Sequence, residues 1–189
     1  MPGPGARLVH MRETTEELRA LQHLLDSSHA GVTDHLRSII TDDRTLRARE
    51  IADLMTGMRV LSLATVTANG EPRISAMDGH FLHGRWTLST DPGSAKGRQI
   101  RARPAVSAAC VEGEEVAVLT HGQVEILTPG HPDRDEVLYY WRDFYGAEAL
   151  PWDDIRLMRI RPTRMVGYAF ARDTVLAARG VEPEVRPER

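Results

Sequence analysis

Residues 60–82 read VLSLATVTANGEPRISAMDGHFL. Apolar and polar side chains alternate on both sides of Asn69-Gly70, and this period of two is typical of β-strands that bury one face. Asn-Gly is the strongest short-range hairpin signal, because both positions of a two-residue turn need positive φ. The stretch therefore predicts a β-hairpin with strands at residues 60–67 and 73–82.

Further strand and helix patterns surround this hairpin. Extended runs are predicted at residues 86–90, 106–111, 116–127, 157–161 and 165–170. Helices are predicted at residues 14–25 and 34–40, from Asp43 or Thr45 to Gly57, from the turn at 91–94 to Arg103, and at 135–145. The pattern predicts a mainly β (α+β) fold, a six-stranded antiparallel barrel with peripheral helices and an N-terminal helical extension.

Three segments follow from these patterns. We expect a helical extension at residues 1–45, a barrel domain at 46–172 and a loosely ordered tail at 173–189. In the extension, Thr14 and Glu17 have the spacing of a capping box at a helix start. Leu18, Leu21 and Leu25 share one face of that helix, so the helix is expected to pack against the barrel.

The composition is that of an ordinary globular protein. The 189 residues are 41% hydrophobic and 27% charged. A net charge of −3 argues against an electrostatically driven nucleic-acid partner. No apolar run reaches the length of a membrane span or a signal peptide, and the single cysteine, Cys110, excludes an internal disulfide. We expect a cytoplasmic protein without nucleic-acid or membrane partners.

The histidines do not indicate a metal site. His23, His29 and His35 are six residues apart and cannot line one helix face. His80 and His83 have no third ligand at a useful spacing. No metal site is predicted.

Lys96 is the only lysine among 24 basic residues, and it lies in the segment DPGSAKGRQIRARP at residues 91–104. A turn here leads through small residues into a basic helix. Such a junction can offer backbone N–H groups, a hydroxyl and cations to a phosphate. A lysine ammonium meets a phosphate as a compact point charge. The segment therefore predicts a phosphate site.

The order of these elements resembles the pyridoxamine 5′-phosphate oxidase-like split β-barrel superfamily. The resemblance spans residues 50–168 and rests on VLSLATV at 60–66, NGEPRIS at 69–75, LST at 88–90, SAK at 94–96 and RPAVS at 103–107. Members are typically homodimers that bind FMN, or the deazaflavin coenzyme F420, in grooves between the subunits. The resemblance implies a split β-barrel, a homodimer, and FMN as the cofactor with F420 as the alternative.

The matching positions give the expected cofactor site. Arg73 matches the phosphate-contacting arginine of the family, and Lys96 matches the lysine after the small-residue turn. The resemblance and its neighbouring residues together assign cofactor binding to Arg73, Ser75, Ser89, Thr90, Ser94, Lys96 and Arg98. His80 and Trp152 are expected in the substrate pocket, where an imidazole could transfer a proton.

Some positions depart from the true oxidases. Ala95 and Asp78 stand where those enzymes carry basic residues, and their arginine-rich C-terminal motif is missing. The oxidase reaction is therefore not expected to carry over. The AKGRQIR run at 95–101, with WDD at 152–154 and VGY at 166–168, looks nearer to the deazaflavin-using reductases.

The leading functional hypothesis is an oxidoreductase that uses FMN or F420 on a small organic substrate. The cofactor would carry the chemistry, and no catalytic side chain is assigned. One alternative is a non-catalytic carrier, sensor or storage protein for the cofactor. Another is a split barrel that binds haem through a histidine. A homodimer is expected in each case, because a partner covers open strand edges and an apolar face.

Overall fold

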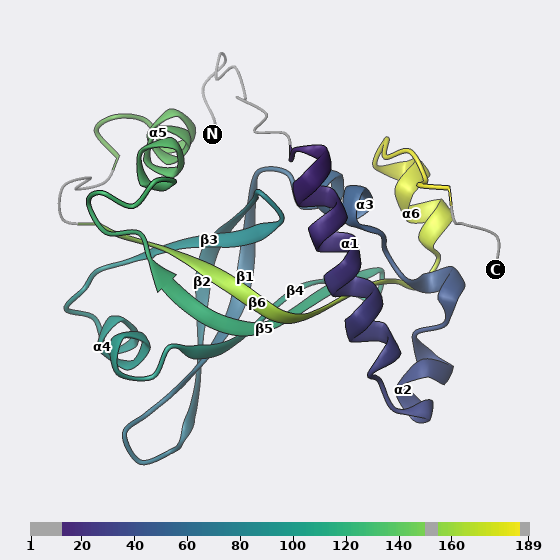
Figure 1. Ribbon diagram of the computed structural model, residues 1–189, viewed down its shortest axis with the longest axis horizontal. Helices are drawn as coiled ribbons and strands as arrows, with labels where there is room; N and C mark the ends of the chain where they lie inside the picture. The colour runs from purple at the N-terminus through teal and green to yellow at the C-terminus, as the bar shows by residue number, and fades with distance from the viewer. Residues whose placement is uncertain (1–12, 150–154, 186–189) are drawn as a thin grey trace.

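The computed structural model describes residues 13–149 and 155–185. Six strands close into a barrel in the order β1-β2-β3-β6-β5-β4, and each neighbouring pair is antiparallel (Figure 1). The strands are β1 (Met58–Val66), β2 (Pro72–Leu82), β3 (Arg85–Thr90), β4 (Ala105–Glu112), β5 (Val116–Ile126) and β6 (Arg156–Ala169). The predicted mainly β fold with a six-stranded antiparallel barrel is confirmed.

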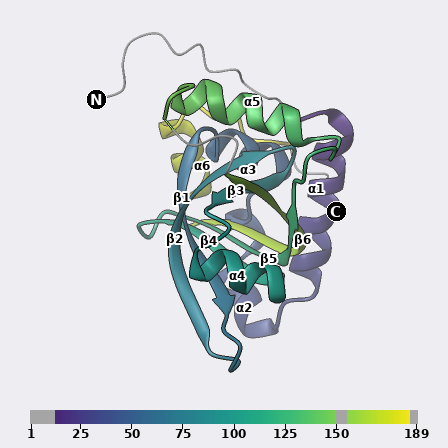
Figure 2. The ribbon, with the colours of Figure 1, turned by 90° about the vertical axis from the view of Figure 1, so that its left-hand side faces the viewer.

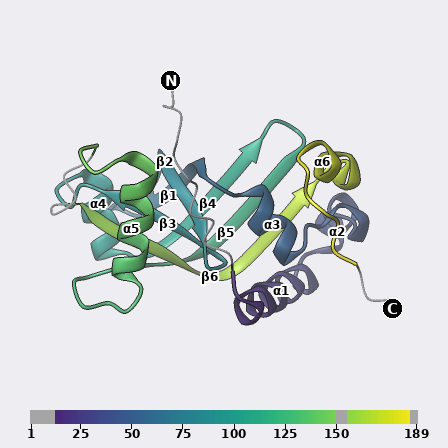
Figure 3. The ribbon, with the colours of Figure 1, turned by 90° about the horizontal axis from the view of Figure 1, so that it is seen from above.

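The helices lie at the two ends of the barrel. They are α1 (Thr15–Ala30), α2 (Asp34–Ile39), the 3-10 turn η1 (Asp42–Arg44), α3 (Ala48–Leu54), α4 (Ala95–Ala102), α5 (Arg134–Tyr145) and α6 (Arg172–Ala178). Helices α1, α2, α3 and α6 gather at one end, and α4 and α5 lie at the other (Figures 1 and 3). None of the helices in the described ranges is both long and apolar enough to cross a membrane.

The turns of the β1–β2 and β2–β3 hairpins differ in type. At Asn69-Gly70 only the glycine has positive φ, 82°, and Gly70 N donates to Thr67 O over 3.1 Å. The loop is therefore longer than two residues, and the predicted turn type is wrong, although the hairpin forms. His83 and Gly84, between the paired Leu82 and Arg85, have φ of 54° and 70°. That turn is the two-residue one with positive φ at both positions.

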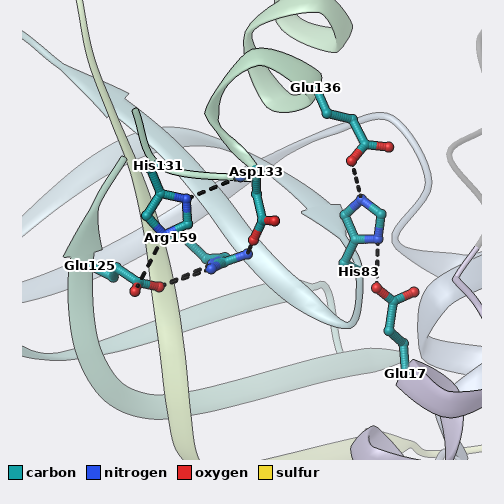
Figure 4. A network of polar contacts seen from close by, with 7 residues as sticks. All are labelled: Glu17, His83, Glu125, His131, Asp133, Glu136 and Arg159. Atoms are coloured by element: carbon teal, nitrogen blue, oxygen red, sulfur yellow. Dashed lines mark hydrogen bonds and ion pairs between the residues drawn. The ribbon is translucent and has the colours of Figure 1, made fainter. Parts of the chain in front are cut away.

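The His83 side chain of this turn contacts both α1 and α5. Its Nδ1 lies 2.8 Å from Glu17 Oε1 on α1, and its Nε2 lies 3.6 Å from Glu136 Oε2 on α5 (Figure 4). Beside it, Arg159 on β6 pairs with Glu125 on β5 at 3.0 Å and with Asp133, just before α5, at 2.5 Å. These contacts tie α1 and α5 to the barrel.

Strand β6 is continuous, whereas the sequence predicts two runs at 157–161 and 165–170. The interruption at Pro162 is absorbed by a bulge, where the register of β5 against β6 shifts between His121 and Gly122. A Cβ at Gly122 would lie only 2.2 Å from Arg161 O, so glycine is required for this close approach. The predicted break is therefore wrong, because a partner strand accommodates the proline.

The N-terminal helix shares the core of the barrel. Thr14 and Glu17 form the predicted capping box. Leu21 and Leu25 are buried in the same cluster as the strand residues, and Ser28 Oγ accepts a hydrogen bond of 3.0 Å from Met165 N on β6. The predicted packing against the barrel is confirmed, and it occurs at the end away from α4 (Figure 3).

A buried ion pair organises the segment after β6. Glu50 on α3 is fully buried and accepts hydrogen bonds from the Arg172 guanidinium and from Glu184 N. Helix α6 therefore forms where a loosely ordered tail is expected from the sequence, and Val181 after it is buried. The last residues of that expected tail, 186–189, lie outside the described part of the chain.

Candidate functional site

The junction between β3 and α4 has the predicted small-residue turn. Ser94 is the N-cap of α4: its Oγ accepts from Gly97 N over 3.0 Å and lies 3.1 Å from Thr90 Oγ1. A Cβ at Gly97 would lie 2.6 Å from Asp91 O, so the helix starts pressed against the turn. The N–H groups of Ala95 and Lys96 open this helix, and helix N-termini favour anions.

Arg73 and Ser75 lie on the neighbouring hairpin. Arg73 pairs with Thr65 and Ser75 with Leu63 in the register of β1 and β2, so both side chains share the face of those β1 residues. Thr65 Oγ1 donates to Gln99 Oε1 on α4 over 2.7 Å. Helix α4 therefore contacts β1 at the residue directly opposite Arg73, and it runs across this end of the barrel (Figure 2).

The predicted cations of this region are Arg73, Lys96 and Arg98. Arg73 is mostly exposed, and its Nη2 lies 3.0 Å from Glu71 Oε2. An exposed pair of this kind contributes about 0–1 kcal/mol, so a stronger anion can replace it. Arg98 Nη1 donates to the Gly93 carbonyl in the turn, and Lys96 is half-buried. The structure thus places three cations on two adjacent elements.

Ser89 points away from this group. It neighbours Thr90 along β3, and successive strand residues face opposite sides. Its pairing partner on β6 is Leu157, which packs with Trp141 of α5. Of the predicted cofactor-binding residues, Thr90, Ser94, Lys96, Arg98, Arg73 and Ser75 gather near α4, and Ser89 faces α5.

His80 lies beneath α5 rather than on an open pocket wall. It is fully buried, and its ring is surrounded by Tyr140, Trp141, Phe144 and Tyr145. Its Nδ1 lies 3.2 Å from the Tyr140 hydroxyl, and its Nε2 lies 3.1 Å from the Tyr145 hydroxyl. Burial lowers the pKa of His80 to about 4, so the ring is neutral at physiological pH.

One tautomer of His80 satisfies all of these contacts. The Tyr145 hydroxyl donates to Asp78 Oδ2 over 3.1 Å, so its oxygen is available to accept from His80 Nε2–H. His80 Nδ1 then accepts from the Tyr140 hydroxyl. Desolvation raises the pKa of both tyrosines, which keeps them as donors. Asp78 thereby anchors α5 to β2. The other predicted pocket residue, Trp152, lies outside the described residues.

Sequence reasoning missed Gln99 and the two tyrosines that contact His80. Thr65 continues the inward-facing positions of Leu61 and Leu63, and a polar residue in such a series needs a buried partner. That signal predicts a partner for Thr65 but cannot identify Gln99. Within the described ranges, no group of three or more His, Cys, Asp or Glu is placed to hold a metal ion.

An apolar face of the sheet is uncovered in the single chain. Val60, Ile74, Val111 and Leu119 on β1, β2, β4 and β5 are 38–75% exposed. The register places them on the outer side of the barrel, among the small side chains of Ser62, Ala64 and Ala109. Large apolar side chains in such a group mark an interaction surface more often than scattered ones do.

Solved structures share this fold. A conserved hypothetical protein from Mycobacterium tuberculosis aligns with a TM-score of 0.58 and 23% identity, over 79% of this chain and 97% of that one. The haem storage protein HutZ from Vibrio cholerae aligns with a TM-score of 0.52 and 17% identity, over 60% and 89%. At such identities the similarity shows the fold alone. An F420 reductase aligns with a TM-score of 0.46 and 22% identity, over 71% of this chain and 98% of that one.

The sequence comparisons identify the family. A comparison with curated proteins finds no match. The sequence model of the family described as pyridoxamine 5′-phosphate oxidase matches residues 48–168. That range runs from the start of α3 almost to the end of β6, and it contains the whole α4 junction and the hairpin of Arg73. The chain belongs to the pyridoxamine 5′-phosphate oxidase family.

Proposed function

We propose that this chain binds FMN, with coenzyme F420 as the alternative, and acts as an oxidoreductase on a small organic substrate. The observation that carries the proposal is the α4 junction. There the Ser94 cap, the Thr90 hydroxyl and Lys96 lie next to the hairpin face of Arg73. Both cofactors have a ribityl phosphate, so one phosphate site serves either.

The residues of the junction fit a phosphate. The missing side chain of Gly97 lets the helix start close to the turn, where a Cβ would meet Asp91 O. Phosphate oxygens would accept from the opening N–H groups of α4, from Lys96 and from Arg73. Charge-assisted hydrogen bonds of this kind contribute about 1.5–3 kcal/mol each.

The bound cofactor would supply hydride or electron transfer. The protein's own residues then need only to bind, orient and shield it, and no nucleophilic side chain is required. A phosphorylated pyridoxamine is not the proposed substrate, because Ala95 and Asp78 stand where the true oxidases carry basic residues.

We further propose that the uncovered face of Val60, Ile74, Val111 and Leu119 binds a second copy of this chain. On this face Ile74 is next to Arg73 along β2, although the two side chains point to opposite sides of the strand, so a two-fold partner would lie near the phosphate site. Each cofactor groove would then contain residues from both subunits. Light scattering of wild type and Ile74→Glu tests this, with a dimer expected for the first and a monomer for the second. Equal masses for wild type and Ile74→Glu would contradict the proposed dimer.

Titration with FMN and with F420 tests the cofactor site. Lys96→Ala and Arg73→Ala should each weaken binding by about tenfold or more, since about 1.4 kcal/mol corresponds to one decade. Arg19→Ala, an exposed arginine on α1, is the matched control and should bind as wild type does. Circular dichroism checks that each variant is folded. Unchanged affinity in both site variants would refute the phosphate site.

The absorption spectrum of the purified protein separates the remaining candidates. Flavin, deazaflavin and haem have distinct visible spectra, and a haem protein shows a Soret band. If the protein binds FMN, but neither NADPH nor any small organic substrate tested reduces the bound flavin, the protein is a carrier. If the protein binds none of FMN, F420 and haem, each of these cofactor proposals is refuted.

A further inference from the structure

A pocket lies between the N-terminal helices and β6. These helices lie at the end of the barrel away from α4 (Figure 3). The volume of the pocket is about 480 Å³, which is within the range of small-molecule pockets. Its lining comes mostly from residues 22–47, before the family match begins at residue 48. The pocket therefore belongs to the helical extension and is separate from the proposed cofactor site.

The pocket has an apolar floor and a wall with charges of both signs. Leu25, Leu46, Met165 and Val166 form the apolar part. The charged lining residues are Asp26, Arg37, Asp42 and Arg47, with His29 beside them. Two acids and two arginines give a formal charge of zero with His29 neutral. A ligand with a single charge would be attracted by half of these charged residues and repelled by the other half.

The acidic side is held in place by a fixed amide. Gln22 Oε1 accepts from Ala48 N over 2.9 Å, and Gln22 Nε2 donates to Asp26 Oδ1 over 2.7 Å. The Asp26 carboxylate is thereby oriented by a side chain that the backbone of α3 fixes. A carboxylate with several acceptor sites can bind an ammonium in addition to this amide.

The basic side has donors beyond those that its internal contacts use. Arg37 donates to Ala30 O and Val32 O through Nη2 alone, among the contacts within the described residues. His29 Nδ1 is buried without a hydrogen-bond partner in the described part of the chain. Arg47 Nε, in contrast, pairs with Glu184 Oε1 at 3.4 Å. A buried polar atom without a partner is rare and indicates a bound group or water.

From this arrangement we infer that the pocket binds a small zwitterion of the amino-acid class with an apolar side chain. Its ammonium meets Asp26, its carboxylate meets Arg37, and its side chain lies against the lining residues Leu25 and Val166. Binding there would stabilise the contact of α1 with β6, because both elements line the pocket.

Calorimetric titration of the full-length protein with L-phenylalanine tests the inference. Phenylacetate lacks the ammonium and phenethylamine lacks the carboxylate, so each should bind at least about tenfold more weakly than L-phenylalanine. Asp26→Asn and Arg37→Gln should each weaken L-phenylalanine binding by about tenfold or more. Asp53→Asn and Arg19→Gln, exposed positions outside the pocket, are the matched controls and should bind as wild type does.

Three results would overturn the inference. One is the absence of L-phenylalanine binding to the folded wild-type protein. Another is equal binding of phenylacetate or phenethylamine, which would mean a site for a single charge. The third is wild-type affinity in both pocket variants, with thermal melting showing that they are folded. FMN titration of Asp26→Asn separates this site from the proposed cofactor site, because FMN affinity should be unchanged.

Discussion

Replacing Arg172 by methionine should destabilise the protein strongly, because it leaves the Glu50 carboxylate buried without its counter-ion. Glu50 is 0% exposed. In wild type it accepts from Arg172 Nε at 3.0 Å and from Arg172 Nη2, and also from the backbone N–H groups of Arg47 at 3.0 Å and Glu184 at 2.8 Å. Methionine fills similar space but leaves only the two backbone donors.

The expected cost is about 3–5 kcal/mol, the usual effect of removing one partner of a buried ion pair. For a chain of this length that lowers the melting temperature by roughly 6–20 °C, at about 2–4 °C per kcal/mol. Urea unfolding followed by circular dichroism measures the free energy directly. The local effect should be largest at α6, which begins at Arg172.

The double variant Glu50→Gln with Arg172→Met separates the charge from the packing. It removes both charges and keeps the shape, so it should be less destabilised than the sum of the two single variants by about 0.5–3 kcal/mol. Arg179→Met, which removes a partly exposed arginine that pairs with Glu112, is the control and should cost about 1 kcal/mol or less. If Arg172→Met stays within about 1 kcal/mol of wild type, the pair does not hold α6 in place.

Three more predictions follow from burial and close contacts. The pKa of His80 is lowered to about 4 in the folded protein, so between about pH 6.5 and pH 4 the ring is protonated in the unfolded chain but not in the folded one. The stability present above about pH 6.5 should therefore be lost as pH falls toward 4. Urea unfolding at several pH values should show this loss in wild type and a smaller one in His80→Gln; equal slopes would contradict the assignment. Burial raises the pKa of the Cys110 thiol to about 11, so at pH 8 it should react with a thiol reagent on the order of a hundredfold more slowly than after unfolding. Rapid labelling of the native protein would argue against a buried thiol. Gly97→Ala should cost about 1–3 kcal/mol, because its Cβ meets Asp91 O, and it should weaken FMN binding as well. Wild-type stability and affinity in that variant would show that the junction tolerates a side chain.

Local patterns predicted most of the elements correctly. The alternation in residues 60–82 indicated β1 and β2, and Thr14 with Glu17 indicated the start of α1. These signals depend on interactions between residues close in sequence, such as a cap or the pairing across one turn. The third helix begins at Ala48 rather than at Asp43 or Thr45, because Asp42–Arg44 forms a 3-10 turn and Thr45 bridges to Tyr168 on β6.

Features that depend on distant neighbours could not be predicted. His83 in the turn between β2 and β3 contacts Glu17 on α1, and the bulge at Pro162 requires Gly122 on the partner strand. Helix α6 forms because Arg172 finds the buried Glu50, which is 122 residues earlier in the chain. A charged residue near a chain end is usually solvated, so its sequence position gave no indication of this partner.

The candidate site also combines features that depend on neighbours in sequence with features that depend on distant residues. The sequence by itself determined the chemistry of the α4 junction, since Ser94, Gly97 and the single lysine lie within one short segment whose turn and cap form locally. Only the tertiary structure decided which other residues join it. Strand pairing placed Arg73 opposite Thr65 beside α4, turned Ser89 to the other face and enclosed His80 under α5. The physical reason is that a strand presents its two faces alternately, and the face that meets the site is set by packing against elements far away in sequence.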